Sequence, residues 1–181
     1  VGGQLKNTVA ISNMKNVFIS QHIGDLDFKE AFNAFKKIIS DFKNLYNTNP
    51  EYIIFDLHPD YISTKFAQST GLNLIQVQHH YAHILSCIAE NKIEGEVLGI
   101  SWDGTGFGTD GNIWGGEFLK VNKQKFERFA HFKYFPLPGG EKAIKEVWRI
   151  GASLLYSATD DKDNVKLFYK NYDVSNIRFG R

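Results

Sequence analysis

The segment VQHHYAHILSCIAEN at residues 77–91 is followed, after a short acidic link, by VLGISWDGTGFGTDGNIWGGEFL at residues 97–119. The first segment places three histidines within five residues, and the second carries an acid at the start of a glycine-rich turn. Nothing else in the sequence gathers so much ligand chemistry in so few residues. We therefore treat these two segments as the centre of the chain and the rest as the scaffold that positions them.

Upstream of this centre, strand and helix patterns alternate. Apolar runs at residues 52–57 and 73–77 are typical of buried strands, and apolar residues spaced by three and four predict helices, the first at 27–46 with Asp27 as its cap. Further helices are predicted at 61–69 and from residue 79, and an earlier hairpin at 8–20. This order of strands and helices predicts an α/β fold with a parallel sheet.

Downstream of residue 96 the pattern changes to antiparallel strands. Strands are expected at 97–102, 113–120 and 126–135, with a loop at 103–111 between the first two. A helix is predicted at 143–157, and the charged tail after residue 159 is ambiguous, with a possible helix to residue 169. We place a boundary between two lobes near residues 94–96.

The bulk properties describe a folded chain with no dominant charge. Its 181 residues are 43% hydrophobic and 23% charged, with a formal net charge of +1, so neither a disordered chain nor a broad basic field for nucleic acid is expected. The single cysteine, Cys87, fits a reducing compartment, and we expect it to be packed. No apolar run is long enough for a membrane span. The chain begins with Val1 instead of Met, and we expect a piece of a longer protein.

The histidine pair is a candidate metal site. His79 and His83 are four residues apart, so a helix would place both imidazoles on one face, whereas His80 would point elsewhere. Such a pair is as often a polar face as a set of ligands. Two histidines also do not complete a site, and Asp103, at the end of a strand, is the natural third ligand. A His/His/Asp set suits zinc or iron.

The loop after Asp103 and the start of the chain could face an anion. Gly104, Thr105 and Gly106 offer backbone N–H groups and a hydroxyl, although a plain glycine-rich β-turn explains the same residues. Lys6 follows a Gly-Gly pair and could add a cation, or could be an exposed lysine. The stretch WGGE at 114–117 has two interpretations, a continuation of the site and a bulged strand.

Other positions add little chemistry to this centre. His58 and His79 both fall at the carboxyl ends of predicted parallel strands, where ligands bind in such sheets. The chain offers no plausible nucleophile, because neither a Ser-His-Asp nor a Cys-His arrangement is visible. The nucleophile would then come with the substrate.

Several motifs together carry a family resemblance. They are VQHHYAH (77–83), SWDGTGFGTDGNIWGGEF (101–118), GGQLKNT (2–8), SQHIGDL (20–26), DLHPDYIST (56–64) and LPGGEKAIKE (137–146). With these, the sequence resembles the HypF carbamoyltransferases of nickel–iron hydrogenase maturation, from its first residues to about residue 149. Glu141 and Val147 are mild departures, since Asp and Pro are expected there.

The resemblance implies the first part of a C-terminal module similar to the TsaD tRNA threonylcarbamoyl transferases. That module has the two-lobed fold of the sugar kinase, Hsp70 and actin superfamily, here with a complete first lobe at residues 1–94 and a truncated second lobe at 95–181. The family is cytoplasmic and uses carbamoyl phosphate and ATP. Through a carbamoyl-adenylate, it transfers carbamoyl to the C-terminal cysteine of HypE, and this carbamoyl becomes cyanide on the hydrogenase iron. The resemblance implies neither a nucleic-acid partner nor a membrane partner.

By the same resemblance, His79, His83 and Asp103 match the metal ligands, and Lys6 and Asp103 match catalytic residues. Gly104, Thr105 and Gly106 match the phosphate loop of the nucleotide. A further Asp ligand and the adenosine motif are expected beyond residue 181, so the isolated chain is expected to be inactive. Two rival hypotheses remain: an O-carbamoyltransferase acting on a small-molecule hydroxyl, and a non-catalytic metal-binding fragment.

Overall fold

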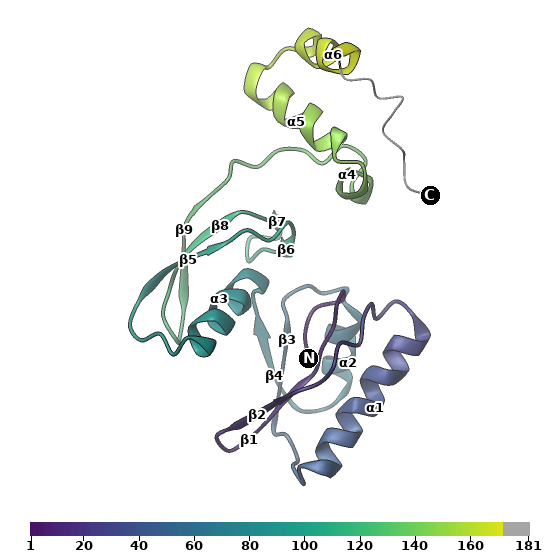
Figure 1. Cartoon of the computed structure of the whole chain (residues 1–181), viewed down its shortest axis with the longest axis vertical. Helices are drawn as coiled ribbons and strands as arrows, with labels where there is room; N and C mark the ends of the chain where they lie inside the picture. The colour runs from purple at the N-terminus through teal and green to yellow at the C-terminus, as the bar shows by residue number, and fades with distance from the viewer. Residues whose placement is uncertain (172–181) are drawn as a thin grey trace. The chain divides into compact units, whose positions relative to one another are not determined.

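The computed structural model describes residues 1–171 and has an α/β fold (Figure 1). The chain forms two compact units, Val1–Phe132 and Lys133–Arg181. The first unit contains both central segments of the sequence. The lobe boundary predicted at residues 94/95 lies inside this unit and stays a prediction, and the last ten residues of the predicted second lobe lie outside the described part.

The first unit begins with a hairpin and a long helix. Strands β1 (Ala10–Asn13) and β2 (Asn16–Ile19) pair antiparallel, and helix α1 (Lys29–Leu45) buries Phe35 and Ile38 on its apolar side. The buried residues of this layer are Val9, Leu26, Phe35 and Ile38.

The expectation that Asp27 caps α1 is wrong. The residue at the cap position is Phe28, and the helix begins at Lys29. The Asp27 carboxylate instead accepts a hydrogen bond from the Gln4 side chain at 2.8 Å. This bond ties the start of the chain to the segment that leads into the helix.

The predicted parallel pair is confirmed. Strand β3 (Tyr52–Asp56), helix α2 (Ile62–Ser69) and strand β4 (Asn73–Val77) follow one another along the chain, and β3 and β4 pair parallel with Asp56 opposite Val77. Helix α3 (His79–Glu90) begins two residues after β4. The end of β3 and the start of α3 therefore meet at one edge of the sheet.

The second sheet of this unit is antiparallel, in the order β5 (Val97–Ser101), β8 (Glu117–Val121) and β9 (Phe126–His131). Two short strands, β6 (Gly106–Phe107) and β7 (Ile113–Trp114), pair beside it. The third strand ends at His131, earlier than the predicted residue 135, and pairs with β8 through a bulge at Phe118/Leu119.

Helix α3 packs on this second sheet. Ile84 and Ile88 join a buried cluster with Trp114, Leu119 and Val121. The approach is close at β5, because a Cβ atom on Gly99 would lie 2.5 Å from Ile84 Cδ1. Only a residue without a side chain fits there, so Gly99 sets the distance between helix and sheet.

The second unit contains α4 (Glu141–Lys145), α5 (Trp148–Thr159) and α6 (Lys162–Asn171). The single helix predicted at 143–157 is wrong, because Glu146 leaves helical geometry at φ −113° and ψ 73° and separates α4 from α5. Ser153 donates a hydrogen bond to the Pro136 carbonyl at 2.6 Å, which holds α5 to the segment before α4.

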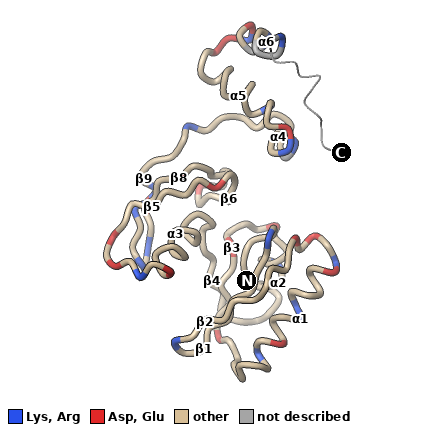
Figure 2. The backbone as a smooth tube through the Cα atoms, viewed as in Figure 1, with Lys and Arg blue, Asp and Glu red and all other residues tan. Residues whose placement is uncertain are grey.

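Acidic and basic residues are both scattered along the described chain (Figure 2), in keeping with a formal net charge of +1. None of the described helices is both long and apolar enough to cross a membrane.

Candidate metal centre

Three elements bring the candidate ligands to one place. Gln78 caps α3 by accepting the Tyr81 N–H at 3.0 Å, so the helix starts with His79 and places His83 one turn later. Asp103 follows β5, two residues beyond its end. Because α3 packs on β5, the helix start and the strand end face one another.

The three predicted ligands meet with distances that suit a small divalent ion. His79 Nε2 and His83 Nε2 lie 2.9 and 3.4 Å from Asp103 Oδ2, and 3.2 Å from each other. An ion with bonds of 2.0–2.1 Å in tetrahedral geometry separates its ligand atoms by about 3.3 Å. Among the described residues, these three form the group that could hold a metal.

The charges of this group are unbalanced. The ion-pair partners of Asp103 in the described chain are the two imidazoles, and its Oδ1 accepts the Gly104 N–H at 2.9 Å. A neutral imidazole has one N–H, which His79 directs at Asp56, 2.6 Å from its Nδ1. That hydrogen bond is the main reason why the pKa of His79 is raised. Either a second proton or a cation must therefore stand between His79 and Asp103.

Asp56 is a neighbour of the candidate ligand His79 that sequence reasoning missed. Its side chain is 6% exposed and lies behind His79, on the side away from Asp103. The signal was present in the sequence, because Asp56 ends a predicted parallel strand at the edge where His79 begins its helix.

His80 is confirmed as pointing away from the site. It is fully buried, its Nδ1 lies 3.1 Å from Gln78 Nε2, and burial lowers its pKa. A Cβ atom on Gly106 would lie 2.6 Å from His80 Cε1 and 3.0 Å from His79 Cβ. Gly106 is therefore required by the packing of the loop on α3.

The other loop residues differ from Gly106. Gly104 and Thr105 are exposed, and a Cβ atom on Gly104 would meet nothing within 4 Å. The Gly104 N–H is already occupied by Asp103, which fixes the orientation of that carboxylate. The role of the exposed Thr105 as a nucleotide contact stays a prediction.

The start of the chain reaches the centre through Gly3. A Cβ atom on Gly3 would lie 3.6 Å from His79 Cε1 and 3.8 Å from the Tyr61 ring. Tyr61 stacks on His58 with ring centroids 4.1 Å apart, and burial, Asp56 and Asp103 raise its pKa. Lys6 is exposed, and none of the described contacts joins it to the cluster.

Within the WGGE stretch, Glu117 is buried and accepts hydrogen bonds of 2.6 and 2.9 Å from Arg128, so it is not a member of the cluster. Gly115 lies closer, because a Cβ atom there would come within 2.6 Å of the Gly104 carbonyl oxygen and 3.2 Å of that of Asp103. Cys87 is exposed, so the expectation that it is packed is wrong. It lies next to the stripe of Ile84 and Ile88 that faces the sheet, and one helical step turns it to the surface.

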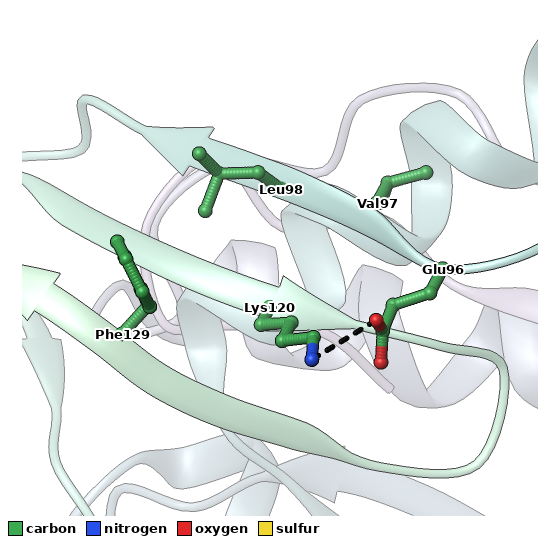
Figure 3. Close-up of a pocket in the computed structure, with 5 residues that line it drawn as sticks. All are labelled: Glu96, Val97, Leu98, Lys120 and Phe129. Atoms are coloured by element: carbon green, nitrogen blue, oxygen red, sulfur yellow. Dashed lines mark ion pairs between the residues drawn. The ribbon is translucent and has the colours of Figure 1, made fainter.

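A shallow hollow of about 250 Å³ lies on the second sheet, away from this centre (Figure 3). It is lined by Glu96, Val97, Leu98, Lys120 and Phe129. Lys120 and Glu96 form an ion pair of 3.1 Å across it, which raises the lysine pKa. With its one acid and one base already paired, this hollow offers less chemistry than the His/His/Asp group.

Comparison with known proteins matches both halves of the chain to neighbouring parts of one protein family. Residues 1–90 match the HypF Kae1-like domain, and residues 99–178 match the second subdomain of the Kae1-like domain of carbamoyltransferases. The carbamoyltransferase HypF of Synechocystis sp. is 46% identical over 162 residues, covering 89% of this chain and 21% of the relative. That of Rhizobium leguminosarum is 39% identical over 157 residues, covering 87% and 21%.

A solved structure agrees with these sequence matches. A crystal structure of full-length HypF in the phosphate- and nucleotide-bound form superposes with a TM-score of 0.84 at 42% identity, covering 97% of this chain and 24% of that one. The chain thus spans about a fifth of the length of the curated relatives it matches.

Proposed function

The chain belongs to the HypF carbamoyltransferase family, and we propose that it forms the metal-binding part of an enzyme of hydrogenase maturation. In this proposal, the longer protein transfers carbamoyl from carbamoyl-adenylate, made from carbamoyl phosphate and ATP, to the C-terminal cysteine thiol of HypE. The names of the relatives support the reaction class. The phosphate and nucleotide bound to the solved HypF structure support a nucleotide intermediate.

The observation that carries the proposal is the convergence of two imidazole nitrogens and one carboxylate oxygen. His79, His83 and Asp103 would hold zinc or iron, and the spacing of 2.9–3.4 Å between their ligand atoms fits such an ion. When bound, the metal would supply Lewis-acid chemistry at the carbamoyl or phosphate oxygens.

The chain's own residues would orient the reactants. The Gly104 N–H holds the Asp103 carboxylate toward the imidazoles, and the exposed Thr105 hydroxyl can donate to a phosphate oxygen. Gly106 supports the same loop by its packing on α3. Lys6, an exposed cation on the segment that passes the centre at Gly3, is proposed to meet the negative charge of the carbamoyl-adenylate.

The acceptor supplies the nucleophile that the chain lacks. The cysteine sulfur of the acceptor forms a bond to the carbamoyl carbon, and the bond from that carbon to the AMP oxygen breaks. AMP leaves with the electron pair, and the thiol proton is lost to solvent before attack, since the thiolate is the reactive form.

The finer architecture and the location belong to the same proposal. We infer the two-lobed fold of the sugar kinase, Hsp70 and actin superfamily, with lobes at residues 1–94 and 95–181. The match of two successive Kae1-like subdomains, at residues 1–90 and 99–178, supports this division. We also propose a cytoplasmic location, which the sparse cysteine content supports.

The metal site is tested by elemental analysis of the purified chain. We expect near-stoichiometric zinc or iron in the wild type and its loss in the His79→Ala/His83→Ala variant. His22→Ala/His131→Ala removes the same number of imidazoles elsewhere and should keep the metal. Equal metal content in all three proteins would contradict the site.

The activity is tested in the full-length protein that contains the chain. We expect carbamoylation of the HypE C-terminal cysteine, detected as a mass increase, to depend on His79 and His83. Carbamoylation of a small-molecule hydroxyl in place of the thiol would favour the O-carbamoyltransferase alternative. Metal binding without either product would favour the non-catalytic one.

A further inference from the structure

Asp56 has contacts that give it a specific task at the metal centre. We propose that Asp56 is a positioning residue that fixes the proton of His79 on Nδ1 and thereby turns the lone pair of Nε2 toward the metal. The inference deepens the proposed function and rests on it, because it concerns the same centre.

Both oxygens of the Asp56 carboxylate have defined partners. Oδ2 lies 2.6 Å from His79 Nδ1, and Oδ1 accepts the backbone N–H of His58 at 2.9 Å. The backbone carbonyl of Asp56 accepts the hydroxyl of the fully buried Thr64 at 3.2 Å. The carboxylate is thus held at both oxygens, and the Thr64 bond holds the backbone that carries it, so the carboxylate cannot turn to another partner without losing a hydrogen bond.

This arrangement decides which nitrogen of His79 carries the proton. A carboxylate only accepts hydrogen bonds, so the nitrogen that faces Asp56 must carry N–H. In a neutral imidazole, the other nitrogen then has the lone pair, and in His79 that nitrogen is Nε2, which faces Asp103 and His83. Such carboxylate–histidine pairs behind a metal fix ring orientation and raise the basicity of the ligand nitrogen.

Asp56 is not itself placed as a ligand. Its Oδ2 lies on the Nδ1 side of the ring, whereas the group that could hold the metal consists of His79, His83 and Asp103. Asp56 also joins two parts of the centre, because the carboxylate that holds His79 shapes the loop of His58 and Tyr61 through its other oxygen.

The substitution Asp56→Asn tests the inference sharply. The amide oxygen is needed by the His58 N–H, so the amide NH₂ would face His79 Nδ1 and donate to it. His79 would then change to the other tautomer, with the proton on Nε2, the nitrogen proposed to bind the metal. Asp60→Asn is the matched control, since it removes one charge from the same loop at an exposed residue whose ion pair with Lys65 is 3.8 Å long.

Two measurements read the outcome in the 181-residue chain. One is the tautomer of His79 in the metal-free protein at alkaline pH, from the ¹⁵N resonances of its ring. The other is the dissociation constant for Co²⁺, from its absorption spectrum. We expect Nδ1–H in the wild type and Asp60→Asn, Nε2–H in Asp56→Asn, and a Co²⁺ dissociation constant raised about 10- to 100-fold in Asp56→Asn alone.

The outcomes separate the inference from the function on which it rests. Nε2–H in the wild type, or a Co²⁺ affinity of Asp56→Asn within twofold of the wild type, would overturn the role of Asp56. A wild type with Nδ1–H that binds no Co²⁺ would overturn the metal site of the proposed function, while the tautomer would still support the control of His79 by Asp56.

Discussion

Asp103 and Glu117 belong to the same glycine-rich segment, yet they have opposite surroundings. The Glu117 side chain is 1% exposed, accepts two hydrogen bonds from Arg128 and one from the Gly115 N–H at 3.0 Å. The Asp103 side chain is 37% exposed and faces two imidazoles and the Gly104 N–H. One acid is neutralised by a cation of the chain itself, and the other is not.

The difference shows how acids in one motif divide between structure and chemistry. Arg128 is always charged and also lies over the Trp114 ring at 3.9 Å, so its pair with Glu117 locks β8, β9 and β7 together. An imidazole is positively charged only when it is protonated. Two neutral imidazoles beside a carboxylate therefore leave its negative charge available to a cation from solution. Three predictions can break or sharpen this contrast.

The largest effect is expected from Glu117→Gln. Removing one partner of a buried ion pair leaves the other charge uncompensated, and we expect the free energy of unfolding to fall by about 3 kcal/mol. Asp103→Asn, at a half-exposed site, should cost less than about 1 kcal/mol in the metal-free protein. Urea denaturation of both variants measures this. Equal losses in the free energy of unfolding would show that Glu117 and Asp103 contribute to stability in the same way.

A nearly equal effect is expected from adding metal. Zinc at 100 times its dissociation constant should raise the free energy of unfolding by about 2.7 kcal/mol. Glu117→Gln should keep this gain, because Glu117 lies outside the cluster, and Asp103→Asn should lose most of it. A gain that survives in Asp103→Asn, measured by thermal unfolding with and without zinc, would remove Asp103 from the ligand set.

The smallest effect separates two glycines of the same loop. Gly106→Ala should cost about 1–2 kcal/mol and weaken zinc binding, because the added methyl group meets His80 at 2.6 Å and pushes the loop away from α3. Gly104→Ala meets nothing within 4 Å and should change stability by less than about 0.5 kcal/mol. Urea denaturation and zinc titration of the two variants test this, and similar losses would argue against a packing role for Gly106.

Much of the fold follows from the spacing of apolar residues along the sequence. The parallel β3–β4 pair and the antiparallel sheet were predictable because apolar runs and turns mark strands directly. The start of α1 was not predictable, because the Asp27 carboxylate could either cap the helix or accept a hydrogen bond from a distant residue. In the structure it accepts one from Gln4. The break at Glu146 was also hidden, since nothing in the local pattern forbids a continuous helix.

The candidate site was predictable where spacing along one helix decides geometry. His79 and His83 share a face by helical period alone, and Asp103 was suggested by its place at a strand end. The position of Asp56 at the same sheet edge followed from the predicted parallel strands, but its contact with His79 Nδ1 was missed because it depends on how the two side chains pack. The burial of Gly106 against His80 and the Glu117–Arg128 pair were missed for the same reason: both depend on tertiary packing between segments separated in sequence.

The two glycines that touch α3 have a consequence for how this centre can change. Gly99 accommodates Ile84, and Gly106 accommodates His80, so two hydrogen atoms in place of two methyl groups set the height of the helix above its sheet. That height decides whether Asp103 reaches the imidazoles. We therefore expect substitutions at these two glycines to change the affinity of the proposed metal centre without altering any ligand.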